Sequence, residues 1–132
     1  MTTFALDTNV VSYLLKNDER LFRIFDAETD NGNTFVIPPV AYYEIKRGLL
    51  AVKALNQLKL FDALCRRLYI GSMATAEWDA AAKIYADLRQ HGKPVEDADI
   101  FIAAFCLVGG YTLITCNAKH FTRIQGLKVT SW

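Results

Sequence analysis

The stretch TFALDTNVV, residues 3–11, decides how this chain begins to fold. Residues 3–6 are typical of a short buried strand, and the apolar spacing of residues 9–16 indicates a helix. Asp7 stands at the junction, where its carboxylate is suited to cap the helix. A carboxylate directly behind a buried strand must find donors or a cation, because burying an unpaired charge costs more than a domain of ordinary stability can spare. We therefore expect a functional site at this junction.

Strands and helices alternate through the rest of the sequence. We expect further strands at residues 34–37, 68–70, 111–115 and 127–129 and further helices at 18–28, 39–49, 51–65, 75–90 and 97–108. This alternation predicts one α/β domain spanning residues 1–132, with a central parallel sheet covered on both faces. In such sheets, binding sites form beyond the carboxyl ends of the strands, where the strand order reverses.

Composition limits the classes of function. At 132 residues and 52% apolar residues, the chain is long enough for a single core. Its net charge of +1 gives no overall attraction to nucleic acid, so an RNA ligand would need a local basic patch. The first candidates for RNA contact are Lys46 and Arg47, with a solvated helix face as the alternative. Further basic residues follow at Lys53, Lys59, Arg66 and Arg67.

The sequence also bears on the compartment. It shows no signal-peptide pattern and no run of about 20 apolar residues that would span a membrane. The three cysteines, Cys65, Cys106 and Cys116, follow neither zinc nor disulfide spacing, and we expect reduced thiols in the core. These features favour a cytoplasmic protein without a membrane partner.

Four acidic residues stand where an α/β fold can gather them: Asp7, Glu44, Asp97 and Asp99. Ordinary alternatives exist, because Asp97 is suited to cap a helix, Asp99 to face the helix dipole, and Glu44 to lie exposed. Two carboxylates about 4 Å apart repel by roughly 4 kcal/mol at an effective dielectric near 20, and a divalent cation would reverse that sign. Carboxylate ligands without His or Cys suit Mg²⁺ or Mn²⁺ better than zinc. Such a site meets the requirements for hydrolysing a phosphodiester.

Four motifs carry a resemblance that spans nearly the whole chain. They are Asp7-Thr8-Asn9, Pro39-Val40-Ala41-Tyr42-Tyr43-Glu44 with Gly48, Asp97-x-Asp99-x-x-Ile102-Ala103-Ala104, and Thr115-x-Asn117-x-x-His120-Phe121. In this order and spacing they resemble the PIN domain of VapC toxins. The resemblance implies a PIN-like three-layer α/β/α fold and a metal-dependent ribonuclease. Such a ribonuclease is the toxin of a VapBC-type type II toxin–antitoxin system and hydrolyses RNA such as tRNA or rRNA through a metal-activated water.

The resemblance also assigns roles to individual acids. Asp7, Glu44 and Asp99 match the acidic triad of the family. Asp97 matches an additional acid, and Asn117 stands where other members carry a fourth Asp. We predict that Asp7 and Asp99 hold Mg²⁺ directly, with Mn²⁺ as a substitute. Glu44 and Asp97 are predicted to act through water or to position the nucleophile.

Further expectations concern the polar residues near the acids and the protein partners. Asn9, Thr115 and Asn117 are expected to orient the acids by hydrogen bonds, and the Asn at position 117 keeps an oxygen ligand while removing a charge. His120 is expected to have a structural or surface role. The resemblance further implies a cognate VapB-type antitoxin and a homodimer.

Other functions remain open on the sequence alone. One is a phosphatase-like α/β enzyme with Asp7 as a covalent nucleophile, although Asn9 replaces the second acid usual in that class. Another is a non-catalytic PIN-fold module that binds RNA or protein. A purely structural protein is a third. No serine or cysteine shows the base partner that a covalent nucleophile needs.

Overall fold

The computed structural model describes residues 2–132 as five strands and six α-helices. The strands are β1 (Thr3–Leu6), β2 (Thr34–Ile37), β3 (Tyr69–Ile70), β4 (Thr112–Thr115) and β5 (Val129–Ser131). The helices are α1 (Thr8–Leu15), α2 (Glu19–Asp30), α3 (Pro39–Ala51), α4 (Leu55–Cys65), α5 (Thr75–Gln90) and α6 (Asp97–Gly109), followed by the 3-10 turn η1 (Ala118–His120). The strands form one sheet in the order β3-β2-β1-β4-β5, and every neighbouring pair is parallel. The predicted parallel sheet is confirmed.

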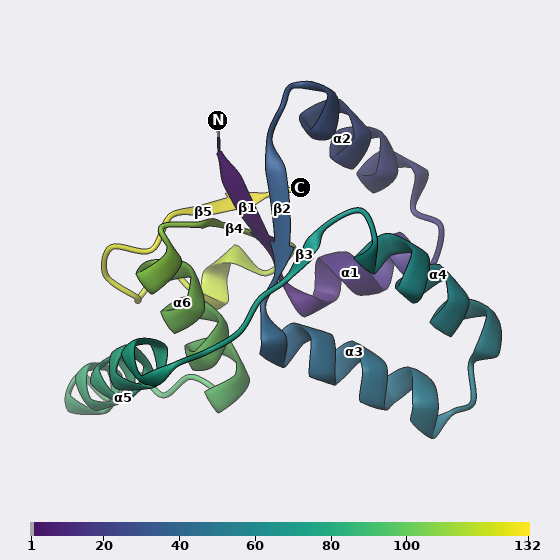
Figure 1. Ribbon diagram of the computed structural model, residues 1–132. Helices are drawn as coiled ribbons and strands as arrows, with labels where there is room; N and C mark the ends of the chain where they lie inside the picture. Colours follow the sequence, from purple (N-terminus) through teal and green to yellow (C-terminus); the bar gives the residue numbers. More distant parts are fainter. Residues whose placement is uncertain (1) are drawn as a thin grey trace.

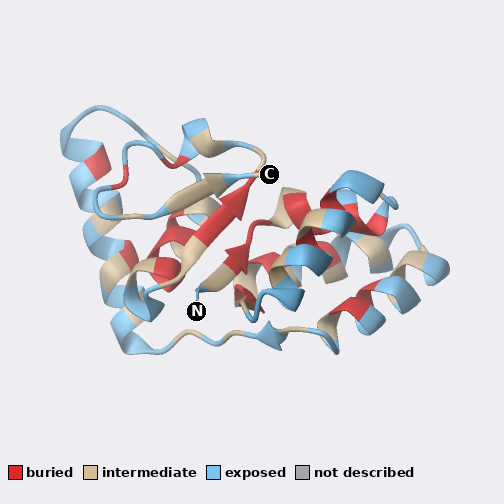
Figure 2. Ribbon diagram, turned by 90° about the horizontal axis from the view of Figure 1, so that it is seen from above, coloured by how far each residue is buried: buried red, intermediate tan, exposed pale blue. Residues whose placement is uncertain are grey.

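Helices cover the sheet on both faces, which gives the predicted three-layer α/β/α arrangement. Figure 1 shows α5 and α6 to the left of the central strands and α1 to α4 to their right. The apolar helix α6 packs against β4 and carries α5 on its outer side. Figure 2 shows the buried residues concentrated in the central strands and on the helix faces turned toward them. Burial of both sheet faces explains the consecutive apolar residues in the central strands β1, β2 and β4.

The strand order reverses beside β1, and this places the site. The chain first adds β2 to one edge of β1 and later adds β4 to the other. The backbone N–H of Asp7 donates to the carbonyl oxygen of Ile114 at 2.9 Å, so the pairing of β1 with β4 continues to the last residue before α1. The carboxyl ends of β1 and β4 therefore lie side by side at a topological switch point.

Most predicted elements agree with the structure to within about two residues at each end, and the largest difference is at the start of α4. The helix expected from residue 51 begins at Leu55, because α3 continues through Gly48 to Ala51 and Lys53 then adopts a left-handed backbone with φ 53°. That conformation ends a right-handed helix. The last strand lies two residues later than expected, at Val129–Ser131, where it pairs with β4.

The structure bears on the predicted absence of membrane-spanning segments and on the predicted state of the cysteines. No helix within residues 2–132 is long and apolar enough to cross a membrane. All three cysteines are free thiols, but only Cys106 is buried in the core, and Cys65 and Cys116 are partly buried against it. Burial raises the pKa of Cys106 to about 12. A thiol with so high a pKa is protonated near neutral pH and is a poor nucleophile.

Substitutions at two glycines would test how α6 packs against the segment that follows β3. A Cβ added at Gly71 would collide with the ring of Phe105 on α6 and approach the Ile37 carbonyl oxygen to 3.2 Å, whereas a Cβ at Gly48 in α3 meets nothing within 4 Å. We expect Gly71→Ala to lower the free energy of unfolding by about 1–3 kcal/mol through overpacking. Gly48→Ala should raise it by about 0.5–1 kcal/mol through helix propensity.

Urea denaturation of the two variants and the parent measures both effects. Equal stability of Gly71→Ala and the parent would show that α6 does not pack as described.

Candidate active site

Asp7 is the most buried acid of the site, with 5% of its surface exposed. It caps α1, and its Oδ1 accepts the Thr8 backbone N–H at 2.8 Å. Its Oδ2 accepts the hydroxyl of Thr115 at 2.7 Å. The strand-to-helix junction read from the sequence therefore lies where it was predicted, and both carboxylate oxygens have donors from the chain itself.

Thr115 connects the ends of β1 and β4. Its fully buried hydroxyl donates to Asp7 and accepts the backbone N–H of Asn117 at 3.0 Å. The Asn9 side chain reinforces the same corner, because its Oδ1 accepts the Cys116 backbone N–H at 3.1 Å and its Nδ2 lies 3.5 Å from the Thr115 hydroxyl. Thr115 thus contacts Asp7 directly and Asn9 contacts Thr115 and Cys116, and their orienting roles stay predictions.

Glu44 reaches the same place from α3. It lies on the second turn of that helix, half-buried, and its Oε1 accepts the hydroxyl of Thr8 at 2.8 Å. Pro39 in the first turn of α3 presets the helical backbone directly after β2. The alternative of an exposed helix residue is therefore wrong for Glu44, because Thr8 holds its carboxylate toward the end of β1.

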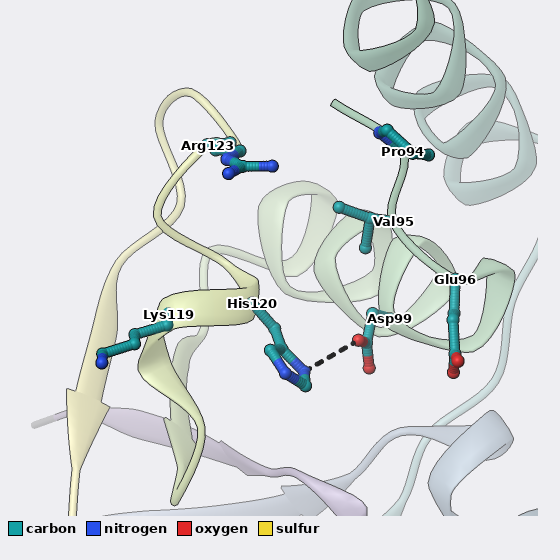
Figure 3. Close-up of a pocket in the computed structure, with 7 residues that line it drawn as sticks. All are labelled: Pro94, Val95, Glu96, Asp99, Lys119, His120 and Arg123. Atoms are coloured by element: carbon teal, nitrogen blue, oxygen red, sulfur yellow. Dashed lines mark ion pairs between the residues drawn. The ribbon is translucent and has the colours of Figure 1, made fainter. Parts of the chain in front are cut away.

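Asp99 enters from the first turn of α6. Its Oδ2 lies 3.4 Å from Nδ1 of His120 on η1, an ion pair when the imidazole is protonated. Figure 3 shows the His120 ring pointing toward Asp99 across the gap between η1 and α6. His120 was expected to have a structural or surface role, and its contact with Asp99 makes it part of the site.

One pocket of about 400 Å³ gathers these side chains at the carboxyl edge of the sheet. Three of the acids predicted from the sequence line it, one each from the cap of α1, from α3 and from α6: Asp7, Glu44 and Asp99. The remaining side chains that face the pocket are Thr8, Asn9, Ser12, Tyr13, Lys16, Glu96, Ala98, Asn117 and His120. The fold therefore brings together three acids that lie far apart in the sequence.

The acids perturb each other's ionisation. Burial raises the pKa of Asp7, and nearby Glu44 adds to that rise, while hydrogen bonds from Thr115 and Thr8 oppose it. Burial also raises the pKa of Asp99, followed by repulsion from Asp7, with His120 acting in the opposite direction. A negatively charged pocket of this kind favours a bound cation or a shared proton.

The donor set fits a hard divalent cation in its chemistry. Carboxylates of Asp7, Glu44 and Asp99, together with the amide oxygen of Asn117, are oxygen ligands of the kind that Mg²⁺ and Mn²⁺ prefer. Within residues 2–132, no three His, Cys, Asp or Glu side chains already lie close enough to coordinate one ion. Thr8 and His120 hold Glu44 and Asp99 in the present arrangement, so these acids would have to exchange those contacts for a metal.

Some predicted site residues lie outside this pocket. Asp97 is exposed at the start of α6 and does not line it, and the cap position belongs to Glu96. Lys46 lies 3.6 Å from Asp62 and Arg47 stacks over a tyrosine ring. Neither of these two cations lines the pocket.

Three further residues of the acidic pocket were not predicted from the sequence. Thr8 binds Glu44, Glu96 lines the pocket, and Lys16 reaches it from the end of α1. Thr8 had a signal, because it lies between Asp7 and Asn9 in the first motif. Glu96 had a weaker one, since it precedes the helix that carries Asp99.

Comparison with known proteins agrees with this geometry. Residues 4–127 match the PIN domain family. Ribonuclease VapC1 of Haemophilus influenzae (strain R2866) is 26% identical over 98% of this chain and 97% of its own length. The tRNA(fMet)-specific endonuclease VapC of Shigella flexneri is 28% identical over 100% and 99%.

Solved structures give the same result. A VapBC2 complex of Rickettsia felis, bound to a DNA fragment from its promoter, contains a chain that superposes with a TM-score of 0.91 at 27% identity, covering 99% of both chains. DNA-bound VapBC of Salmonella typhimurium gives a TM-score of 0.89 at 26% identity, covering 100% and 99%. The resemblance to the PIN domain of VapC proteins is confirmed.

Burial of Asp7 predicts a pH-dependent stability. Because burial raises the pKa of Asp7 above its ordinary value of 3.8, the carboxylate lowers the free energy of unfolding at a pH above its folded pKa. That cost disappears as the pH falls through the folded pKa toward 3.8, since the folded state takes up the proton first.

We therefore expect Asp7→Asn in chelator to be at least as stable as the parent at pH 7.5, and the difference to shrink toward pH 4. Urea denaturation across this pH range measures it. A variant that unfolds well before the parent at pH 7.5 would show that the hydrogen bonds from Thr8 and Thr115 outweigh the cost of burying the charge.

Proposed function

Because this chain belongs to the PIN-domain family, we propose that it is a metal-dependent ribonuclease toxin of a VapBC-type toxin–antitoxin system. The observation that carries the proposal is the convergence of Asp7, Glu44 and Asp99 in one pocket at the switch point of the sheet. The names of its relatives, which are ribonucleases and endonucleases, support the same activity. The substrate we propose is tRNA or rRNA, and the cofactor is Mg²⁺ with Mn²⁺ as a substitute.

Each pocket residue has a part in the proposed reaction. Asp7 and Asp99 would hold Mg²⁺ directly, and Glu44 would bind it through water or position the nucleophile. When bound, the ion supplies a Lewis acid that lowers the pKa of water and attracts phosphate oxygens. Thr115 keeps the Asp7 carboxylate in place, and Thr8 does the same for Glu44. Asn117 offers an amide oxygen at the rim.

Two other functions receive less support. A covalent role for Asp7 is disfavoured, because Asn9 stands where enzymes of that class carry their second acid. A non-catalytic module would bury Asp7 at an energetic cost without using its charge. A trapped aspartyl-phosphate would favour the first alternative, and calorimetry showing no binding of Mg²⁺ would favour the second.

The proposal predicts a metal requirement and a ranking of the acids. RNA cleavage should need Mg²⁺ or Mn²⁺ and stop in EDTA, with Ca²⁺ a poor substitute. Asp7→Asn and Asp99→Asn should each lower kcat/KM by about 100-fold or more, because a contact with the ion is worth several kcal/mol. Asp97→Asn is the matched control, since Asp97 is exposed outside the pocket, and it should change kcat/KM by less than about threefold.

Cleavage of total tRNA and of rRNA, followed on gels, measures both effects. RNA cleavage that continues after exhaustive EDTA treatment would contradict the metal-dependent mechanism. A loss at Asp97→Asn as large as at Asp99→Asn would restore Asp97 to the catalytic set predicted from the sequence.

We also propose a VapB-type antitoxin as partner and a homodimer as the assembly. Support for the antitoxin comes from the solved structures above, which are VapBC complexes. An Arg or Lys from the antitoxin would satisfy the carboxylates of the pocket as a metal does and would block access to it.

This partnership predicts that inhibition depends on one cation of the antitoxin. Replacing that Arg or Lys by Ala should restore RNA cleavage while the two proteins still co-purify. A structure of the inhibited complex with a solvent-open pocket would contradict the idea and indicate inhibition from a distance.

A further inference from the structure

A second pocket adjoins the acidic one and has a different charge pattern. It has a volume of about 350 Å³ and lies between η1 and the segment that leads into α6. Glu96, Asp99 and His120 line both pockets, so the two form one continuous surface. The additional lining residues are Pro94, Val95, Lys119 and Arg123.

The two walls of this second pocket carry opposite charges. Figure 3 shows Glu96 and Asp99 on the α6 side and Lys119, His120 and Arg123 on the η1 side. Lys119 and Arg123 are exposed and form no ion pair with any residue in 2–132. Lys16 lines the acidic pocket, so Lys119 and Arg123 are the two cations that the chain leaves available in the second pocket.

The chain holds this basic wall in a fixed shape. Phe121 and Ile124 are buried, at 1% and 6% exposure, and anchor the segment to the core. The Phe121 backbone N–H donates to the Ala118 carbonyl oxygen at 3.0 Å, and the Thr122 hydroxyl donates to the Lys119 carbonyl oxygen at 3.2 Å. Lys119 and Arg123 thus extend from an ordered turn whose neighbours point inward.

We propose that this second pocket binds the RNA backbone next to the scissile phosphate, with Arg123 and Lys119 each holding one neighbouring phosphate. The inference rests on the proposed ribonuclease function and adds the direction in which the strand leaves the site. Carboxylates repel the phosphates of RNA, so a strand that reaches the acids needs cations close by. The apolar wall of Pro94 and Val95 offers a surface for the attached ribose or base.

This placement differs from the basic residues that the sequence favoured. Lys46 pairs with Asp62 and Arg67 pairs with Asp26, and neither basic residue lines either pocket. Arg123 and Lys119 share a pocket with Asp99, which links RNA binding directly to the proposed catalytic acids.

The test compares two double variants of equal charge. Lys119→Ala with Arg123→Ala removes the proposed contacts, and Lys83→Ala with Arg23→Ala removes one exposed lysine on α5 and one exposed arginine on α2, neither of which lines either pocket. The first variant should raise KM for RNA about 10- to 30-fold at 0.1 M salt with kcat within about threefold of the parent, and the second should change neither.

Binding is measured separately from cleavage. RNA binding is measured by fluorescence anisotropy in an Asp7→Asn background without metal, with a single-stranded RNA fragment that the parent cleaves. The plot of log binding constant against log salt concentration should have a slope smaller in magnitude by about 1.4 for Lys119→Ala with Arg123→Ala. Each lost phosphate contact removes about 0.7 from that slope.

The outcomes separate the two proposals. Cleavage and RNA binding by Lys119→Ala with Arg123→Ala that equal those of the parent would overturn the inference and leave the ribonuclease function intact. An equal loss in the Lys83→Ala, Arg23→Ala control would also overturn it, since the effect would then be one of net charge. A parent protein that neither cleaves nor binds RNA would refute the proposed function and this inference together.

Discussion

The structure depends on how the buried carboxylate of Asp7 is satisfied. Its two oxygens accept one hydrogen bond from the Thr8 backbone and one from the Thr115 hydroxyl. The second bond joins residues 108 positions apart and fastens the end of β4 to the start of α1. Without such donors, a charge at 5% exposure would cost more than a domain of this size retains as stability. The same two bonds fix the position from which the proposed chemistry starts.

A second consequence of this burial is the charge left in the pocket. Glu44 and Asp99 lie near Asp7, and their repulsion helps to raise the pKa of Asp7 and Asp99. In the metal-free protein, Thr8 donates a hydrogen bond to Glu44, and His120 lies 3.4 Å from Asp99. A divalent cation would compensate the charge of the pocket, so the interactions that make the metal-free protein less stable are the ones that would favour metal binding.

Local signals made much of the fold predictable from the sequence. Asp7 behind a short apolar run and Pro39 behind another each marked a strand followed by a helix, and both junctions lie where they were expected. The turn at Lys53 had no such signal, because a lysine rarely adopts a positive φ. The boundary between α3 and α4 was therefore misplaced.

Two parts of the site could not be predicted, because they depend on contacts between elements. The role of His120 depends on η1 folding back toward α6, which brings it to Asp99, 21 residues earlier in the chain. Lys46 was expected to bind RNA, yet α4 places Asp62 beside it. Contacts between elements decide both cases, and neither contact leaves a pattern in the sequence around the residue concerned.

The most direct test of this account is to find the bound ion. Crystals of the protein soaked in MnCl₂ and measured at the manganese absorption edge would locate it by anomalous scattering. The account predicts a manganese peak in contact with the carboxylates of Asp7 and Asp99. A peak at other residues only, or none at saturating Mn²⁺, would contradict the claim that the fold gathers these acids to bind a metal.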